Sequence, residues 1–119
     1  MPIDYTIDTQ RQLVRTRAWG IVTALEWLAY TDRLKADTDF LPSFDQLADF
    51  TEVTELAIPP GAESQIVAAS AFSKDSRRAA AASTDFVFGM ARMYQGNLPD
   101  GDRIKIFRSL KEAEEWLGT

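Results

Sequence analysis

Residues 13–35 read LVRTRAWGIVTALEWLAYTDRLK, and within them a strand pattern changes to a helix pattern. Side chains of opposite faces alternate with a period of two, as in a strand: Val14, Thr16 and Ala18 alternate with Leu13, Arg15, Arg17 and Trp19. Thr23 and Glu26 then have the spacing of a capping box, in which each side chain bonds to the other residue's backbone amide. Apolar residues follow at helical spacing, so we predict a helix that runs to about Lys35.

The residues on either side of this stretch predict further strands. Residues 5–7 are typical of a short strand, and Asp8 favours a turn over residues 8–11. We therefore expect a hairpin whose second strand ends at Gly20. Beyond the helix, residues 37–44 should form a loop, and residues 46–50 a nearly apolar strand of the kind that helices cover.

The C-terminal half alternates between the two patterns. Pro59, Pro60 and Gly61 mark a helix start, and this helix has an inner stripe of Ala62, Ile66, Ala69 and Phe72. A strand of small residues follows at 78–82, then a helix capped by Ser83 or Thr84 that ends near Gln95. A turn at 97–101, a strand at 103–107 and a second capping box at Ser109 and Glu112 complete the chain.

Helices and strands that alternate in this order predict an α/β fold. We expect one domain, residues 1–119, with a mostly parallel sheet of about five strands and about four helices. The connections between parallel strands should be right-handed crossovers, and the first strand should be the antiparallel exception.

Composition and charge exclude several classes of function. The 119 residues include no cysteine and no histidine, which removes disulfides, thiolate nucleophiles, sulfur- and nitrogen-ligated zinc, and histidine acid–base chemistry. The formal charge of −5 disfavours nucleic acid, because phosphates bind to concentrated positive charge. We expect no signal peptide, because the first residues have no basic region followed by an apolar run, and no apolar stretch approaches roughly 20 residues. We therefore expect a soluble cytoplasmic protein with no transmembrane segment.

Three stretches carry a resemblance to a known family: FDQLADFTEVT at 44–54, VFGMARMY at 87–94, and the segment from IFR at 106–108 to EWL at 115–117. In their order and spacing, these resemble the SpoIIAA-like domains grouped with STAS (sulfate transporter and anti-sigma-factor antagonist) and SEC14-type proteins. The chain is most similar to small stand-alone bacterial members of that group. The resemblance covers nearly the whole chain, and it implies the SpoIIAA-like fold and a regulatory or ligand-binding role.

One feature of that family is missing. The resemblance implies a phosphorylatable serine at the start of the helix after the central strand, where a phosphate is stabilised by free amides. Ala57 and Ile58 occupy about that position, and Ser64 lies further into the helix. This sequence therefore lacks the hydroxyl of the phosphorylation switch.

The helix predicted over residues 85–95 is the strongest candidate for a contact surface. Two neighbouring apolar stripes, Phe86, Met90 and Met93 beside Val87, Ala91 and Tyr94, cover more than half of its circumference. A helix on a sheet needs one stripe of about 100°, so the surplus is either buried by other helices or used for contact. Arg92, on the remaining face, would pair with a carboxylate or an anionic ligand.

Weaker candidates lie on the predicted strands. One strand face carries Arg15, Arg17 and Trp19. It would suit a partner if helices leave it open. Alternatively, the arginine side chains only pack against the tryptophan. Asp49 lies near the C-terminal edge of a parallel strand, where ligand crevices open, although it would also make a turn or a cap. The run Ser76, Arg77 and Arg78 is either an anion site or a solvated loop.

The residues favour binding over catalysis, with no cofactor and no metal. We expect a non-enzymatic module that recognises a protein partner, including a second copy in a homodimer, or a small apolar or anionic ligand. The alternative is a SEC14-type carrier of a lipid or small apolar molecule, which needs a cavity of about 300 Å³ or more. A chain of this length should form one only as a dimer. A third hypothesis is an enzyme that uses Asp49 with Arg92.

Overall fold

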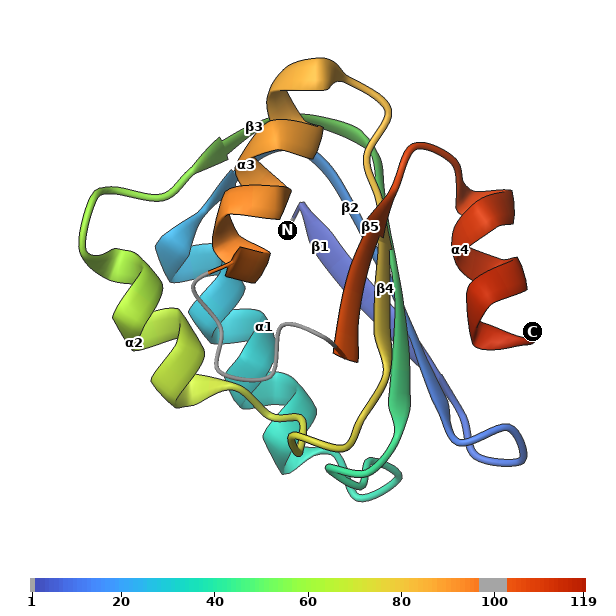
Figure 1. Ribbon diagram of the computed structural model, residues 1–119. Helices are drawn as coiled ribbons and strands as arrows, with labels where there is room; N and C mark the ends of the chain where they lie inside the picture. The colour runs from blue at the N-terminus through green and yellow to red at the C-terminus, as the bar shows by residue number, and fades with distance from the viewer. Residues whose placement is uncertain (1, 97–102) are drawn as a thin grey trace.

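The computed structural model describes residues 2–96 and 103–119 (Figure 1). It contains five strands, β1 (Ile3–Asp8), β2 (Leu13–Thr23), β3 (Asp45–Ala57), β4 (Arg78–Ala81) and β5 (Ile104–Phe107). Its four helices are α1 (Ala24–Ala36), α2 (Ala62–Ala69), α3 (Asp85–Gly96) and α4 (Leu110–Leu117). The predicted turn at 97–101 lies outside the described residues.

The strands form one mixed sheet in the order β1-β2-β3-β4-β5. β1 pairs with β2 in the antiparallel sense, with Ile3 opposite Ala18, and all the other pairs are parallel. The mostly parallel sheet with an antiparallel first strand is therefore confirmed.

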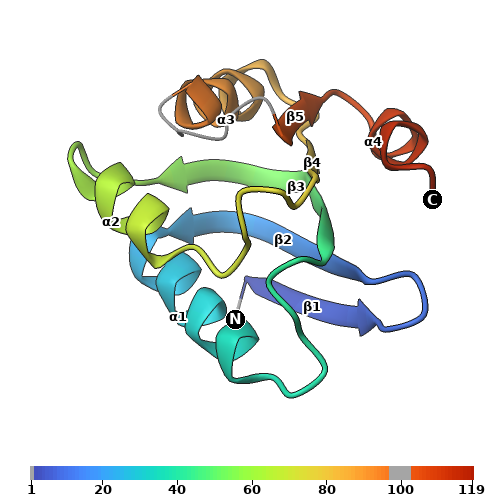
Figure 2. The same ribbon diagram turned by 60° about the horizontal axis from the view of Figure 1, so that its bottom comes forward.

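Helices cover both faces of the sheet, unequally. The first core, on the face that carries Val14 and Ala48, includes side chains of α1 and α3, and α2 packs on α1. The second core joins Leu13 and Leu47 to side chains of α4 alone. Figure 2 shows α4 apart from the other three helices. Because side chains alternate across a strand, β2 and β3 contribute to both cores.

Capping fixes the starts of three helices. Thr23 and Glu26 form the predicted capping box of α1, with the Thr23 hydroxyl accepting from the Glu26 amide and the Glu26 carboxylate from the Thr23 amide. The Thr84 hydroxyl accepts from the amide of Val87 at the start of α3. At α4, the Ser109 hydroxyl accepts from the Glu112 amide and also donates to its carboxylate.

β1 begins two residues earlier than predicted, at Ile3, and three other boundaries differ more from the sequence predictions. β2 continues past Gly20 to Thr23, and β3 continues past Phe50 to Ala57, because the two strands stay hydrogen-bonded through two register shifts. Backbone pairing, rather than an alternating pattern, extends them. α2 ends at Ala69, so that Phe72 lies in the following loop, where it packs against the first core.

Candidate ligand pocket

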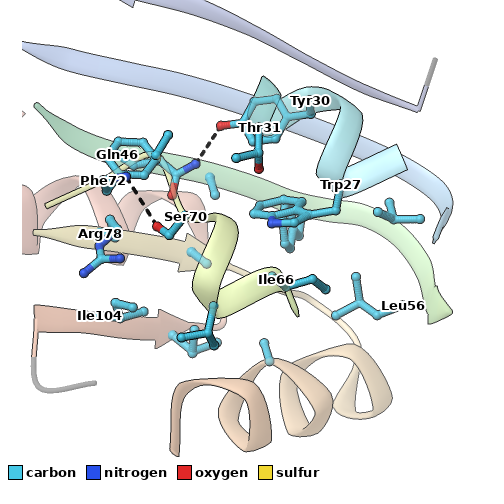
Figure 3. A pocket seen from close by; sticks show the side chains of 18 of the residues that line it. Trp27, Tyr30, Thr31, Gln46, Leu56, Ile66, Ser70, Phe72, Arg78 and Ile104 are labelled. Carbon is cyan, nitrogen blue, oxygen red and sulfur yellow. Dashed lines mark hydrogen bonds between the residues drawn. The ribbon is translucent and has the colours of Figure 1, made fainter. Parts of the chain in front are cut away.

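A pocket of about 470 Å³ lies between α1, α2, α3 and the face of the sheet that they cover (Figure 3). Most residues that line it are apolar. Aromatic rings form part of the wall, since Trp27 lies 5.0 Å from Tyr30 and 5.8 Å from Phe50 between ring centroids. The polar side chains among the lining residues are those of Tyr30, Thr31, Gln46, Ser70, Lys74 and Arg78.

Small side chains leave this space open. Ala48 on β3 and Ala80 on β4 line the pocket from the sheet, and Ala71 and Ala91 line it from the helical side. An alanine side chain ends at Cβ, so two layers that meet through alanines cannot fill the gap between them. The run of small residues in β4 therefore contributes to the volume.

Three polar side chains bond to one another at the pocket wall. The Tyr30 and Thr16 hydroxyl oxygens are 2.7 Å apart, and Gln46 Nε2 donates to both, at 2.9 Å and 3.1 Å. Figure 3 shows the bond between Gln46 and Tyr30. Burial raises the pKa of Tyr30 to about 12, although the bonds from Thr16 and Gln46 oppose that effect. Tyr30 is therefore neutral at physiological pH and fixes the orientation of Gln46.

The charged side chains of the described pocket lining are both cationic. Arg78 is opposite Gln46 in the parallel register of β4 and β3, so its side chain is a neighbour of Gln46 on the pocket face. It is only 7% exposed, and its Cζ lies 5.9 Å from the ring centroid of Phe72. Lys74 is exposed and lies at the rim. No Asp or Glu is among the described residues that line the pocket.

α3 presents part of its predicted contact surface to solvent. Val87 and Ala91 are buried, whereas Phe86 is 62% exposed and Met93 is 72% exposed. Met90 is half-buried, and both Met90 and Met93 line the pocket.

The last two candidate residues on α3 are Arg92 and Tyr94. Arg92 is exposed, with its Cζ 5.9 Å from the ring centroid of Phe88. The side chain of Tyr94 lies outside the described part of the structure.

The arginine-rich strand face lies on the side of the sheet that carries α4. Arg17 forms an ion pair with Glu52 at 2.5 Å, and its Cζ lies 4.9 Å from the ring of Trp19. Arg15 and Trp19 are half-buried. α4 packs on β3, β4 and β5. Arg17 and Trp19 on β2 therefore lie beside α4, where they contact each other and Glu52.

Asp49 makes a local turn within β3. Its Oδ1 accepts from the Thr51 amide at 3.0 Å and from the Thr51 hydroxyl at 2.6 Å, where the register with β2 shifts. Asp49 shares the strand face of Leu47, which packs with α4, whereas Arg92 is on α3. The structure does not bring Asp49 and Arg92 together, and neither lines the pocket.

No protein-family model matches the sequence, and no curated protein is detectably similar to it. A solved structure is similar over 97% of this chain and 93% of its own, with a TM-score of 0.63 and 18% sequence identity. It is an uncharacterized protein of the DUF3478 family from Shewanella loihica PV-4, described as having a SpoIIAA-like fold. The present chain has the SpoIIAA-like fold. At this level of identity the similarity concerns the fold alone.

In this SpoIIAA-like fold, the position discussed for a phosphorylation switch has an apolar role. Ala57 ends β3, and Ile58 packs against the first core and lines the pocket. Ser64 is exposed, and its hydroxyl donates to the Gly61 carbonyl at 3.0 Å. Ile58 therefore contributes an apolar side chain to the pocket wall at this position.

The run Ser76, Arg77 and Arg78 is divided among three places. The buried Ser76 hydroxyl donates to the Phe44 carbonyl at 2.6 Å. Arg77 donates to the carbonyls of Trp116 and Leu117 at the end of α4, at 3.3 Å and 2.9 Å. Arg78 alone lines the pocket, so the three do not form one shared anion site.

Trp27, Tyr30 and Gln46 line the pocket but were not predicted as site residues. A signal was present, because Gln46 is a polar residue on the strand face of Ala48 and Phe50, where a buried amide needs partners. Those partners, Thr16 and Tyr30, come from other elements, so their spacing along the chain does not reveal them.

Residues 2–96 and 103–119 contain neither a metal-binding cluster nor a membrane-spanning helix. No set of three or more acidic side chains converges there on a point where a metal could bind. In the same residues no helix has the length and apolar character needed to cross a membrane.

Proposed function

We propose that this protein is a non-enzymatic binding module that takes one small, mainly apolar molecule into the pocket between α1, α2, α3 and the sheet. The observation that carries this proposal is a largely apolar pocket of about 470 Å³ within one chain. Ligand pockets of about 300–1,000 Å³ with a few placed polar groups are typical of small-molecule sites. The expectation that only a dimer could form a cavity above about 300 Å³ is wrong, because a single chain contains it.

The chemistry of the wall supports an apolar ligand. Trp27, Phe50 and Ile66 are large apolar side chains that border the space. An apolar molecule that moves from water into such an environment gains about 25 cal/mol per Å² of buried apolar surface. The few polar groups would then orient the ligand.

The ionisable groups of the pocket support binding rather than catalysis. A general base needs a pKa near the working pH, and burial raises the pKa of Tyr30 to about 12. The chain has no histidine or cysteine to replace it. The described lining supplies cations and hydrogen-bonding groups, which are suited to recognition.

Trp27 offers a direct test, because it lines the pocket. We expect 1-decanol to change tryptophan fluorescence saturably and to raise the melting temperature, as a ligand of the native state must. Ala80→Phe, which places a ring in the pocket, should abolish both effects. Ala68→Phe, the same change at an exposed position of α2 that does not line the pocket, should preserve them. Equal binding by both folded variants would contradict the proposal.

A protein partner on α3 is the second candidate function, favoured by the exposure of two large apolar side chains, Phe86 and Met93, on one helix. Methionine and aromatic side chains suit contact surfaces. Sedimentation of the wild type and of Phe86→Ser over a range of concentrations tests self-association. A wild type that stays monomeric at all concentrations would exclude a homodimer through this helix.

A further inference from the structure

We propose that the ligand of this pocket is a single-chain amphiphile with a carboxylate head group, bound with its head at Arg78 and its alkyl chain along β3. This inference rests on the proposed function and specifies the chemical class of the ligand. It follows from the charge of the lining, from the position of Arg78 and from the shape of the pocket.

The pocket lining is positively charged, although the whole chain has a net negative charge. The sequence has 18 acidic and 13 basic residues, yet the ionised side chains among the described lining residues are those of Lys74 and Arg78. A cationic pocket in an acidic protein selects against cationic ligands and favours anionic ones. Lys74 at the rim would attract the anion, and Arg78 would hold it inside.

Arg78 has the geometry to bind a carboxylate. It is buried on the pocket face beside Gln46, whose amide is fixed by Tyr30 and Thr16. A guanidinium has five N–H donors in a planar fork that matches a carboxylate. Because it has five donors, Arg78 can bind a ligand carboxylate while it keeps its other partners. In the largely apolar surroundings of the pocket, this ionic contact is weakly screened.

The shape of the pocket favours one extended chain. Gln46 and Leu56 both line it and lie ten residues apart on β3, so the pocket runs along this strand. Its volume of about 470 Å³ is in the lower half of the range of about 300–1,000 Å³ for ligand pockets. Figure 3 shows Arg78 and Leu56 at opposite ends, with Trp27 and Ile66 between them. A single alkyl chain fits this outline better than a two-chain lipid.

Three ligands with the same chain separate the head group from the tail: decanoate, 1-decanol and decylamine, titrated at pH 7.5 and followed by calorimetry. We expect decanoate to bind about 10-fold or more tightly than 1-decanol, because a charge-assisted bond to arginine adds to the same apolar burial. Decylamine should bind most weakly. Across carboxylates of six to ten carbons, affinity should rise about fourfold per methylene.

Variants assign the effect to Arg78. Arg78→Gln should weaken decanoate about 10-fold and leave 1-decanol binding nearly unchanged, which also shows that the pocket is intact. Arg15→Gln, the same change on the opposite face of the sheet, should leave the binding of both ligands unchanged.

The possible failures are distinguishable. Equal affinity of the wild type for decanoate and 1-decanol would overturn the head-group inference and leave the proposed function standing. If Arg78→Gln loses affinity equally for decanoate and 1-decanol, the head-group inference is overturned as well, because Arg78 would then only support the structure of the pocket. If none of the three ligands binds, the proposed function itself is overturned, and the inference with it.

Discussion

The hydroxyl oxygens of Tyr30 on α1 and Thr16 on β2 lie 2.7 Å apart, and the side-chain amide of Gln46 on β3 donates to both. Thr16 and Tyr30 are 2% and 1% exposed, so water cannot replace these bonds. The three groups connect a helix to two strands at the wall of the pocket. They form a fixed polar point in an otherwise apolar layer.

Tyr30→Phe should lower the free energy of unfolding by about 1–3 kcal/mol, because the buried polar groups of Gln46 and Thr16 each lose their bond to the Tyr30 hydroxyl and keep only the bond to each other. Urea denaturation measures the loss. In the Thr16→Val background, the same change should cost less, since one of the two bonds to the Tyr30 hydroxyl is already gone. Fully additive losses in this double-mutant cycle would contradict the coupling.

Stability should fall between about pH 10 and pH 12. Burial raises the pKa of Tyr30 from 10.0 to about 12, so the folded state holds the phenol proton more tightly than the unfolded state. The stabilisation is complete below pH 10 and is lost as the pH rises through the folded pKa, by up to about 3 kcal/mol. Tyr30→Phe should show a smaller decline over this range in denaturation experiments. Parallel pH profiles for the two proteins would be evidence against the burial of Tyr30.

Substitutions at two neighbouring residues of α3 should differ greatly in their effect on stability. Val87 is fully buried in the first core, so Val87→Asp should prevent folding, because an unpaired carboxylate would be buried. Phe86→Asp, one residue earlier and mostly exposed, should change the free energy of unfolding by less than about 0.5 kcal/mol. Circular dichroism and urea denaturation distinguish the two. A strongly destabilised Phe86→Asp would place that side chain in a core.

Arg77→Ala should loosen α4. The Arg77 guanidinium donates to the carbonyls of Trp116 and Leu117, where a helix leaves carbonyl groups unsatisfied. We expect a loss of about 1–2 kcal/mol and faster amide exchange in the last turn of α4, with β1 and β2 unaffected. Arg103→Ala, an exposed arginine bonded to the Asp75 carbonyl, serves as the control. Unchanged exchange in α4 would show that Arg77 does not hold the helix end.

Local patterns predicted the elements well where the signal is local. The capping box of Thr23 and Glu26 placed the start of α1, and the turn after Asp8 placed the hairpin. The extension of β3 to Ala57 was not predictable in the same way. It depends on pairing with β2, which belongs to a distant part of the chain.

The pocket was beyond sequence reasoning for a related reason. A cavity is volume that side chains fail to fill, and Ala48, Ala80 and Ala91 come from three separate elements whose packing no periodicity describes. The apolar stripes of α3 were recognised, but their division into a buried part at Val87 and an exposed part at Phe86 depends on how the helix is rotated on the sheet. Sequence alone does not specify that rotation.

The central claim is that an apolar ligand binds between α1, α2, α3 and the sheet, and methyl and amide NMR shifts recorded on titration with 1-decanol test it most directly. The account predicts saturable shifts concentrated at Ala48, Ile66 and Ala80. Shifts concentrated instead around Phe86 or Trp19, with the pocket residues unmoved at saturation, would contradict it.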